Sequence, residues 1–335
     1  MSAIPTNTFG RTDLVVSRIG FGAWAIGGPA MAGDIAIGWG DIDDAVSVRA
    51  IETALDRGID FLDTADFYGL GHSEELIGQT IGNRAGVTIA TKVGHRLNSD
   101  GSISLDYSKK HILAACDKSL RRLRRDHIDL YQLHSARVAH LKQGECIEAM
   151  EQLVAEGKIR YWGLSLSTYD PEPEGAFLME RGLGHSFQLV LSVINQRAVD
   201  LMRRAAAAGY GIIARMPLQF GLLAGRFNSD SRFGPNDHRS FRLTPRVLEQ
   251  ATLDLEPFFE LARVRAVSPA SIALAFVLSQ PEVSTVIPGM RSPEQAAQNA
   301  EGPFGLTESE KATLGQLYDD RLKDLLGLME RQEKG

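Results

Sequence analysis

The chain has few cysteines and no long apolar run, and both shortages limit what kind of protein it can be. It contains two cysteines in 335 residues, Cys116 and Cys146, and both fall in helical patterns. We therefore expect free thiols in a reducing compartment rather than a disulfide framework. No stretch approaches the ~18 apolar residues of a membrane span. The start, MSAIPTNTFGRTDLVV, lacks the basic and apolar regions of a secretory signal. The sequence predicts a soluble, cytoplasmic protein with no membrane partner.

An excess of positive charge is also lacking. The formal net charge is −6, the pI is near 5.8, and the two signs are mixed along the chain. This balance argues against a nucleic-acid-binding surface, so any polyanionic ligand would need a few local arginines and main-chain N–H groups. The length allows a large core, and α/β barrels often exceed about 250 residues as one domain. We predict a single domain over residues 1–335.

Short apolar runs alternate with amphipathic helical segments along the whole chain. The predicted strands are 18–22, 61–65, 88–93, 128–134, 160–165, 187–192, 211–216 and 284–288. The predicted helices are 46–57, 73–81, 108–122, 144–156, 174–181, 199–208, 245–265 with 269–279, and 293–300. Such alternation predicts an α/β fold with a parallel sheet covered by helices. Eight units favour a closed (β/α)8 TIM barrel over an open sheet.

Several segments lie outside the repeating units. Residues 8–16 predict an N-terminal β-hairpin, and residues 322–332 predict an extra C-terminal helix. The long connections 27–44 and 217–244 follow strand carboxyl ends, where barrels build their sites, so we interpret them as binding loops. Three leucines near the C-terminus would either cover the barrel or form an interface, which leaves a homo-oligomer open: Leu325, Leu326 and Leu328.

Ionisable side chains stand at the ends of three successive predicted strands. Asp63, Lys92 and His134 end the second, third and fourth strands, and Tyr68 follows Asp63 by five residues. Neighbouring strands lie about 4.8 Å apart, so these side chains meet at one mouth of a barrel. An ammonium beside a phenol favours the phenolate and lowers the phenol pKa, and a carboxylate keeps the ammonium charged and oriented. We predict a catalytic site for proton transfer to a carbonyl oxygen, with an imidazole hydrogen-bonding that oxygen.

Other patterns carry a simpler interpretation. No spacing matches a metal site, so we expect no metal. The pairs Asp43-Asp44 and Glu74-Glu75 are interpreted as charges at helix starts. Two GxGxxA matches, at 20–25 and 209–214, lack the strand-then-helix context of a dinucleotide fingerprint. The remaining histidines are interpreted as solvated or structural: His72, His95, His111, His127, His140, His185 and His238.

The chain resembles the aldo-keto reductases from about residue 8 to residue 299. The pieces that carry the resemblance are GFGAW (20–24), GIDFLDTADFYGLGHSEELIG (58–78), TKVG (91–94), IDLYQLH (128–134), GKIRYWGLS (157–165), PLQFGLLAGRF (217–227) and IPGMRSPEQ (287–295). The resemblance implies that Tyr68 is the general acid and that His134 orients the carbonyl. It also implies that Lys92 and Asp63 tune the tyrosine.

The resemblance further implies NADPH or NADP+ lying across the barrel mouth, with NADH as an alternative. Ser165 and Gln188 match positions that bind the carboxamide, and Arg215 stands where many members stack an aromatic ring on the nicotinamide. Leu166 replaces an asparagine of many relatives, and Gly289 replaces a phosphate-binding lysine of some. The other implied cofactor residues are Gly22, Ala23, Trp24, Asp63, Pro217, Leu218, Gly221, Leu223, Gly225, Arg226, Arg291, Gln295 and Asn299.

The predicted substrate is a small carbonyl compound or, in the reverse direction, an alcohol. We expect its pocket to be walled by Trp24, Phe67, Tyr68 and His134, with some of Trp39, Phe220 and Phe227. Two alternatives stay open at this point. One is a non-catalytic regulatory or accessory protein that binds the nicotinamide cofactor on the same fold, and the other is a barrel hydrolase or lyase without nicotinamide.

Overall fold

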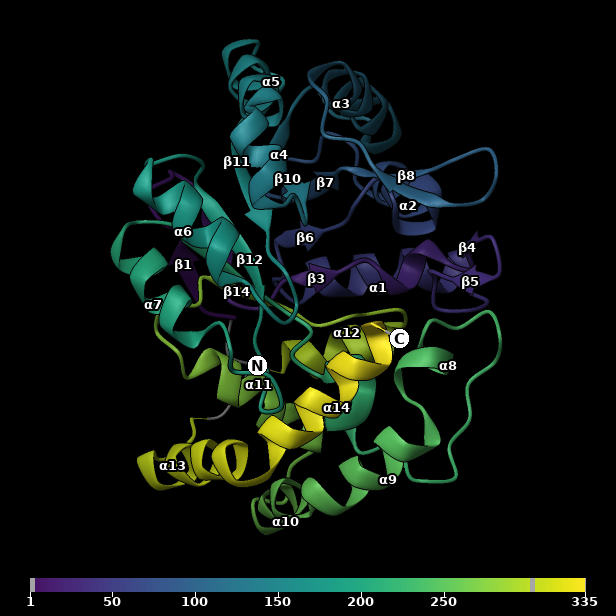
Figure 1. Cartoon of the computed structure of the whole chain (residues 1–335), viewed down its shortest axis with the longest axis vertical. Helices are drawn as coiled ribbons and strands as arrows, with labels where there is room; N and C mark the ends of the chain where they lie inside the picture. Colours follow the sequence, from purple (N-terminus) through teal and green to yellow (C-terminus); the bar gives the residue numbers. More distant parts are fainter. Residues whose placement is uncertain (1–3, 302–304, 335) are drawn as a thin grey trace.

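The computed structural model describes residues 4–301 and 305–334, in which helices surround a barrel of parallel strands (Figure 1). Hydrogen bonds join the barrel strands in sequence order, and the parallel bridges Ile19–Val286 and Gly22–Gly289 close the barrel between its first and last strands. The predicted (β/α)8 barrel is confirmed. Its strands are β3 (Phe21–Gly22), β6 (Phe61–Asp63), β7 (Thr88–Val93), β10 (Ile128–His134), β11 (Ile159–Ser165), β12 (Ser186–Val190), β13 (Gly211–Arg215) and β14 (Thr285–Ile287).

The helices of the barrel follow the prediction with two differences. The predicted helix 245–265 is two helices, because Pro257 lacks an N–H and its ring cannot follow a continuous helical turn. A short helix, α4, also precedes the predicted helix 144–156. The observed helices are α1 (Asp44–Asp56), α2 (His72–Thr80), α3 (Lys109–Leu123), α4 (Val138–Gln143), α5 (Glu145–Ala155), α6 (Glu172–Glu180), α7 (Val199–Ala207), α9 (Pro245–Asp254), α10 (Glu256–Val264), α11 (Pro269–Leu278) and α12 (Pro293–Ala300).

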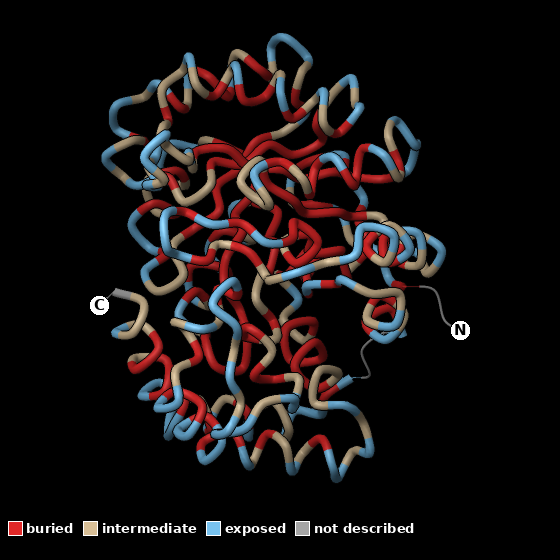
Figure 2. Tube along the Cα trace, turned by 90° about the vertical axis from the view of Figure 1, so that its right-hand side faces the viewer, coloured by how far each residue is buried: buried red, intermediate tan, exposed pale blue. Residues whose placement is uncertain are grey.

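The strands are buried, and exposed residues gather on the outer helices and loops (Figure 2). The predicted hairpin is present as β1 (Thr6–Thr8) and β2 (Val15–Ser17). Its apolar side chains pack with barrel residues in a separate cluster in which the Phe9 and Phe61 rings stack, so the hairpin covers one end of the barrel. The cluster is Phe9, Leu14, Val16, Phe61, Ala90, Leu130, Ile213 and Ile287.

At the other end, the connections that follow the strands carry their own small elements. The loop after β3 contains η1 (Ala25–Gly27), β4 (Met31–Ala32) and β5 (Ile35–Ala36), and the turn after β6 contains η2 (Tyr68–Gly71). The loop after β7 also forms a hairpin, which the sequence analysis missed. The remaining elements at this end are β8 (His95–Leu97), β9 (Ile103–Leu105), η3 (Gln219–Ala224) and α8 (Arg239–Arg242).

Two helices end the chain. They are α13 (Glu308–Leu317), which was not predicted, and α14 (Lys323–Lys334), joined by a π-helical turn over Tyr318–Leu322. Helix α14 packs against α8 and α9 (Figure 1). Leu325, Leu326 and Leu328 are buried within this one chain, so they cover the barrel.

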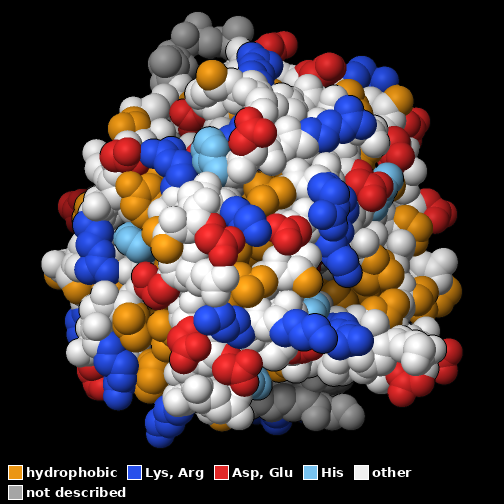
Figure 3. Space-filling view, turned by 90° about the horizontal axis from the view of Figure 1, so that it is seen from above, with side chains coloured by type: hydrophobic (Ala, Val, Ile, Leu, Met, Phe, Trp, Pro, Cys, Tyr) orange, Lys and Arg blue, Asp and Glu red, His pale blue; other side chains and the backbone are white. Residues whose placement is uncertain are grey.

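Among the described residues, no single helix has the length and apolar composition needed to span a membrane. Helices α10 and α11 have that length and composition only when they are taken together, and the chain bends by 97° between them. Lys and Arg side chains alternate with Asp and Glu on the face shown in Figure 3, as the mixed charge of the sequence implies.

Candidate active site

The side chains that point into the barrel form two layers. A polar layer lies nearer the carboxyl ends of the strands, and an apolar layer lies beneath it. Phe61 and Asp63 share the inward face of β6 because side chains two residues apart point the same way. Ala90 and Lys92 do the same on β7, and Leu130 precedes Gln132 on β10. The apolar member of each pair lies in the cluster under the hairpin. The polar members therefore lie together, one layer nearer the carboxyl ends of the strands.

Lys92 is the centre of this polar layer. Its fully buried Nζ donates to Asp63 Oδ2 at 2.6 Å, to the Thr64 carbonyl oxygen at 2.8 Å and to Tyr68 Oη at 3.1 Å. These three acceptors use all three protons of the ammonium. Asp63 Oδ1 accepts from Gln188 at 2.6 Å and from Gln132 at 3.3 Å. The predicted contact between Tyr68, Lys92 and Asp63 is present, and both members of the ion pair are fully hydrogen-bonded.

Tyr68 is positioned by a tight turn rather than by a strand. It begins η2, in which Gly69 and Leu70 have positive φ values of 59° and 55°. A Cβ on Gly69 would lie 2.0 Å from the Gly27 carbonyl oxygen, so only glycine allows η2 to approach the loop after β3 this closely. The close approach presses the tyrosine over the barrel mouth.

Burial changes the proton affinity of both groups. Burial alone lowers the pKa of Lys92, but Asp63 and Tyr68 together outweigh it, and the net pKa is raised, so the ammonium stays charged. Burial raises the pKa of Tyr68, and the opposing effect of Lys92 is smaller. The prediction that the phenol pKa falls below its ordinary value is therefore wrong, because the phenolate loses more hydration than Lys92 replaces. Tyr68 is held in the protonated form that a proton donor requires.

His134 lies on the other side of Tyr68. Its carbonyl oxygen accepts from Tyr107 Oη at 2.5 Å, and its ring meets the Tyr68 ring edge to face, with centroids 5.9 Å apart. Burial, followed by nearby His95, Lys92 and Arg215, holds the pKa of His134 well below its ordinary value. The imidazole is neutral near pH 7 and has one N–H to donate.

His95 is a site residue that the sequence analysis placed among solvated or structural histidines. Its ring lies 4.4 Å from the His134 ring and 5.3 Å from the Phe67 ring, centroid to centroid. Burial lowers its pKa to about 4. A signal was available in the sequence, because His95 follows Thr91-Lys92-Val93-Gly94 at the carboxyl end of a predicted strand.

Glu74 is also more than a charge at a helix start. Its carboxylate is fully buried and accepts from Thr91 Oγ1 at 2.6 Å and from Arg122 Nε at 2.7 Å. This pair ties α2 and α3 to the back of β7, the strand that carries Lys92.

The predicted carboxamide-binding residues lie beside the polar layer that contains Lys92 and Asp63. Ser165 Oγ donates to Gln188 Oε1 at 3.3 Å, and Gln188 reaches Asp63 on its other side. Arg215 ends the next strand, where its guanidinium donates to the Leu166 carbonyl oxygen and to Thr168 Oγ1, both at 3.1 Å. These contacts hold the guanidinium at the barrel mouth.

The other predicted cofactor residues continue around the rim. The side chain of Gln295 accepts from the Arg291 main-chain N–H at 2.9 Å and thereby holds the turn before α12. Gly225, Arg226, Gly289 and Arg291 are exposed; Trp24, Leu218, Gly221 and Gln295 are half-buried; and Gly22, Ala23, Pro217, Leu223 and Asn299 are buried.

The residues at this rim fit an extended dinucleotide. Gln219 Nε2 and Arg215 Nε at the rim are buried and have no partner among the described residues, so the rim holds polar atoms that a ligand would satisfy. Arg226 and Arg291 supply exposed cations, and the N-terminus of α12 supplies main-chain N–H groups for phosphate.

Comparison with known proteins decides the family. The sequence model of the Aldo/keto reductase family matches residues 18–319. The chain belongs to this family. It is 31% identical to an uncharacterized oxidoreductase, YqkF, of Bacillus subtilis over 90% of this chain and 92% of that protein. It is 28% identical to a probable voltage-gated potassium channel subunit beta of Arabidopsis thaliana, over 87% and 88% of the two chains.

Solved structures agree with the assignment to the aldo/keto reductases. A glycerol dehydrogenase from Gluconobacter oxydans is 30% identical and superposes with a TM-score of 0.79, over 96% of this chain and 97% of that one. An aldo/keto reductase from Klebsiella pneumoniae, solved in complex with NADP and acetate, is 29% identical with a TM-score of 0.68, over 93% and 95%.

Aromatic rings cover the mouth of this aldo/keto reductase. The Trp24 ring stacks between Tyr68 at 5.9 Å and His238 at 4.4 Å, centroid to centroid, and Trp39 meets His238 edge to face at 4.4 Å. Phe220 also contacts His238, whereas the Phe227 ring packs on Phe233 further along the loop. These aromatic rings therefore lie together near Tyr68, and their role as the wall of a substrate pocket stays a prediction.

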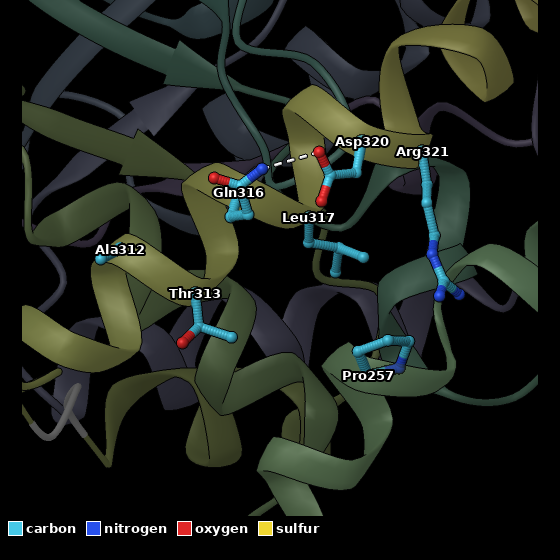
Figure 4. Close-up of a pocket in the computed structure, with 7 residues that line it drawn as sticks. All are labelled: Pro257, Ala312, Thr313, Gln316, Leu317, Asp320 and Arg321. Atoms are coloured by element: carbon cyan, nitrogen blue, oxygen red, sulfur yellow. Dashed lines mark hydrogen bonds between the residues drawn. The ribbon is translucent and has the colours of Figure 1, made fainter.

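A surface pocket lies away from these residues, between α10, α13 and the π-helical turn (Figure 4). It is lined by Pro257, Ala312, Thr313, Gln316, Leu317, Asp320 and Arg321, and Gln316 donates to Asp320 at 2.7 Å. None of the predicted site residues lines it. Within the described ranges, no group of three His, Cys, Asp or Glu side chains is placed to hold a metal ion.

Proposed function

We propose that this protein is an NADPH-preferring oxidoreductase that reduces an aldehyde or ketone to an alcohol and runs the reverse reaction with the same groups. The observation that carries the proposal is the buried Lys92 Nζ, within hydrogen-bond distance of both Asp63 and Tyr68. Family membership, NADP-bound relatives and the polar rim support it.

In the proposed mechanism, the reduced nicotinamide supplies a hydride to the carbonyl carbon. Tyr68 donates a proton from Oη to the carbonyl oxygen, and Lys92 stabilises the phenolate that this transfer leaves behind. The neutral His134 donates an N–H to the same oxygen and fixes its direction. Asp63 keeps Lys92 charged and aimed at Tyr68 Oη.

The same side chains account for cofactor placement. Ser165 and Gln188 would bind the carboxamide, and Arg215 would contact the nicotinamide through its planar guanidinium. Arg226, Arg291 and the N-terminus of α12 would bind the phosphates, and the guanidinium fork of Arg291 favours the additional phosphate of NADPH over NADH.

The test mixes the purified chain with NADPH or NADH and 4-nitrobenzaldehyde and follows the loss of reduced-nicotinamide absorbance. We expect saturable turnover that is faster with NADPH. An Arg291→Ala variant is expected to raise the KM for NADPH at least about tenfold and to change the KM for NADH little. Failure to turn over any carbonyl in a broad panel would contradict the proposal.

The relative named as a potassium channel subunit favours a second candidate, a nicotinamide-binding accessory protein without physiological turnover. The complete set of Asp63, Tyr68, Lys92 and His134 argues against it, because binding alone requires no proton donor. Tight quenching of NADPH fluorescence without turnover on any carbonyl would select this candidate.

A further inference from the structure

The imidazole pair formed by His95 and His134 has unused hydrogen-bonding capacity. The two rings lie 4.4 Å apart at an interplanar angle of 71°. Nδ1 of each ring is buried without a partner, and Nε2 of each makes no hydrogen bond within the described part of the chain. Buried histidines that serve only packing usually satisfy at least one ring nitrogen with the protein. Two unpartnered rings beside a proton donor indicate a ligand.

The surroundings of His95 determine which hydrogen-bonding groups its ring presents to a ligand. Gly94 has a φ of 137°, and a Cβ there would lie 2.2 Å from the Tyr107 ring, so only glycine lets Tyr107 pack this closely. The Tyr107 hydroxyl in turn donates to the His134 carbonyl oxygen. Both rings are neutral near pH 7, because burial lowers both pKa values. Each ring therefore supplies one N–H and one bare nitrogen, which suits a neutral oxygen that can donate or accept a hydrogen bond.

A simple carbonyl cannot use all of these groups. Its single oxygen is served by Tyr68 and His134, which leaves His95 without a hydrogen-bond partner, and a donor left unpaired when a ligand displaces water costs free energy. A hydroxyl on the carbon next to the carbonyl would face the adjacent ring. The Phe67 ring lies 5.3 Å from the His95 ring, centroid to centroid, so His95 also has an apolar neighbour.

We propose that His95 is a specificity-determining residue that binds a second oxygen, so that the preferred substrates are α-hydroxy carbonyl compounds and, in reverse, vicinal diols. The inference rests on the proposed reductase function and names the substrate class of the same site. His95 binds the neighbouring hydroxyl, while Tyr68 and His134 serve the carbonyl oxygen.

The test compares hydroxyacetone with butanone, which replaces the hydroxyl by a methyl group of similar size. We expect the parent to favour hydroxyacetone in kcat/KM by at least about tenfold, since the methyl leaves a donor unpaired. His95→Leu should reduce this ratio at least about tenfold, and His95→Gln, which keeps an N–H, should restore most of it. A second readout is the shift in Tm with NADP+ present, where hydroxyacetone should stabilise the parent more than His95→Leu.

The outcomes separate the inference from the function on which it rests. An unchanged substrate ratio in folded His95→Leu would mean that the ring only packs against His134, and would overturn the inference. Equal losses of activity on both ketones would do the same. Turnover of 4-nitrobenzaldehyde without a preference for hydroxyacetone would remove the substrate class and leave the reductase proposal intact. No turnover on any carbonyl would remove the reductase proposal itself.

Discussion

Lys92 and Asp63 are both inside the barrel, where an unpaired charge is expensive. Their side chains have exposed fractions of 0% and 2%, and each is satisfied by the other together with Thr64, Gln188 or Gln132. A buried pair of this kind adds little net stability, but removing one partner leaves a charge without compensation. The pair therefore matters for the site's chemistry and is sensitive to single substitutions.

Asp63→Asn should destabilise the fold by about 3–5 kcal/mol, because Lys92 keeps its charge and loses its counterion. The free energy of unfolding in urea measures the effect. Asp117→Asn is the matched control, since Asp117 pairs with Lys158 at the surface and should cost no more than about 1 kcal/mol. Similar losses in the two variants would contradict the account of the buried pair.

The pH dependence of carbonyl reduction follows from the raised pKa of Tyr68. Because the folded-state pKa lies above the ordinary value of 10.0, the phenol keeps its proton through neutral and weakly alkaline pH. We expect kcat for reduction to stay level between about pH 6 and 9 and to fall only where the phenol ionises. Steady-state rates across this range are the measurement. A decline centred near neutrality would mean that Lys92 outweighs burial.

The sequence was enough to locate those site residues that stand at the ends of strands. Asp63, Lys92 and His134 end neighbouring strands, and a parallel barrel brings such ends together whatever the loops do. Residue roles that depend on tertiary contacts could not be predicted from the sequence alone. The pairing of Glu74 with Arg122 depends on how two helices pack, and the direction of the Tyr68 pKa shift depends on burial. His95 was missed although its position after a predicted strand was a signal.

At the scale of elements, contacts between helices determine how close η2, the turn that carries Tyr68, lies to the barrel. Helix α2 follows η2 directly and packs on α3. Gly78 allows the approach, because a Cβ there would lie 2.0 Å from the Arg122 carbonyl oxygen. The Glu74–Arg122 ion pair also joins α2 to α3, so the close helix packing and the ion pair together hold α2 in position.

Gly78→Ala is expected to destabilise the protein by about 1–3 kcal/mol, since the helices must separate to admit a methyl group. Gly315→Ala in α13 is the control, because a Cβ there meets nothing within 4 Å and helix propensity favours alanine by about 0.5–1 kcal/mol. Thermal unfolding of the two variants should move Tm in opposite directions. A Gly78→Ala variant as stable as the parent would refute the packing argument.

Element positions were predictable where periodicity is strong. The strands 88–93 and 128–134 have the predicted bounds, because β-branched or apolar residues make up most of each run. The break at Leu255 was missed although Pro257 marks it, and α13 was missed because its exposed faces give little apolar periodicity. Short hairpins such as β8–β9 depend on pairing that alternation alone does not reveal.

Across the whole molecule, loops from distant parts of the chain meet over the barrel mouth. Trp39 and Asp237 form an antiparallel bridge, and the His238 N–H donates to the Gly38 carbonyl oxygen at 3.1 Å. The fully buried His238 side chain accepts at Nδ1 from Arg242 Nη1 at 3.1 Å, and Arg242 pairs with Glu333 of α14. The C-terminal helix thus supports the cover above Tyr68.

His238→Ala should loosen this cover, because it removes the ring that fills the space between Trp24 and Trp39. We expect faster tryptic cleavage at the exposed Arg226 and Arg232, with protection when NADPH is added. His127→Ala, at a half-exposed histidine away from the loops, is the control and should cleave like the parent. Equal cleavage of all three proteins would show that His238 does not join the loops.

The central claim is that Tyr68 donates the proton while Lys92 holds it in place, and Tyr68→Phe tests this most directly. NADPH affinity and reduction of 4-nitrobenzaldehyde are measured on the same folded preparation, with Tyr161→Phe as the control. The account predicts NADPH binding within about threefold of the parent, kcat lower by at least about a hundredfold, and an unaffected control. Parent-like turnover by folded Tyr68→Phe would contradict it.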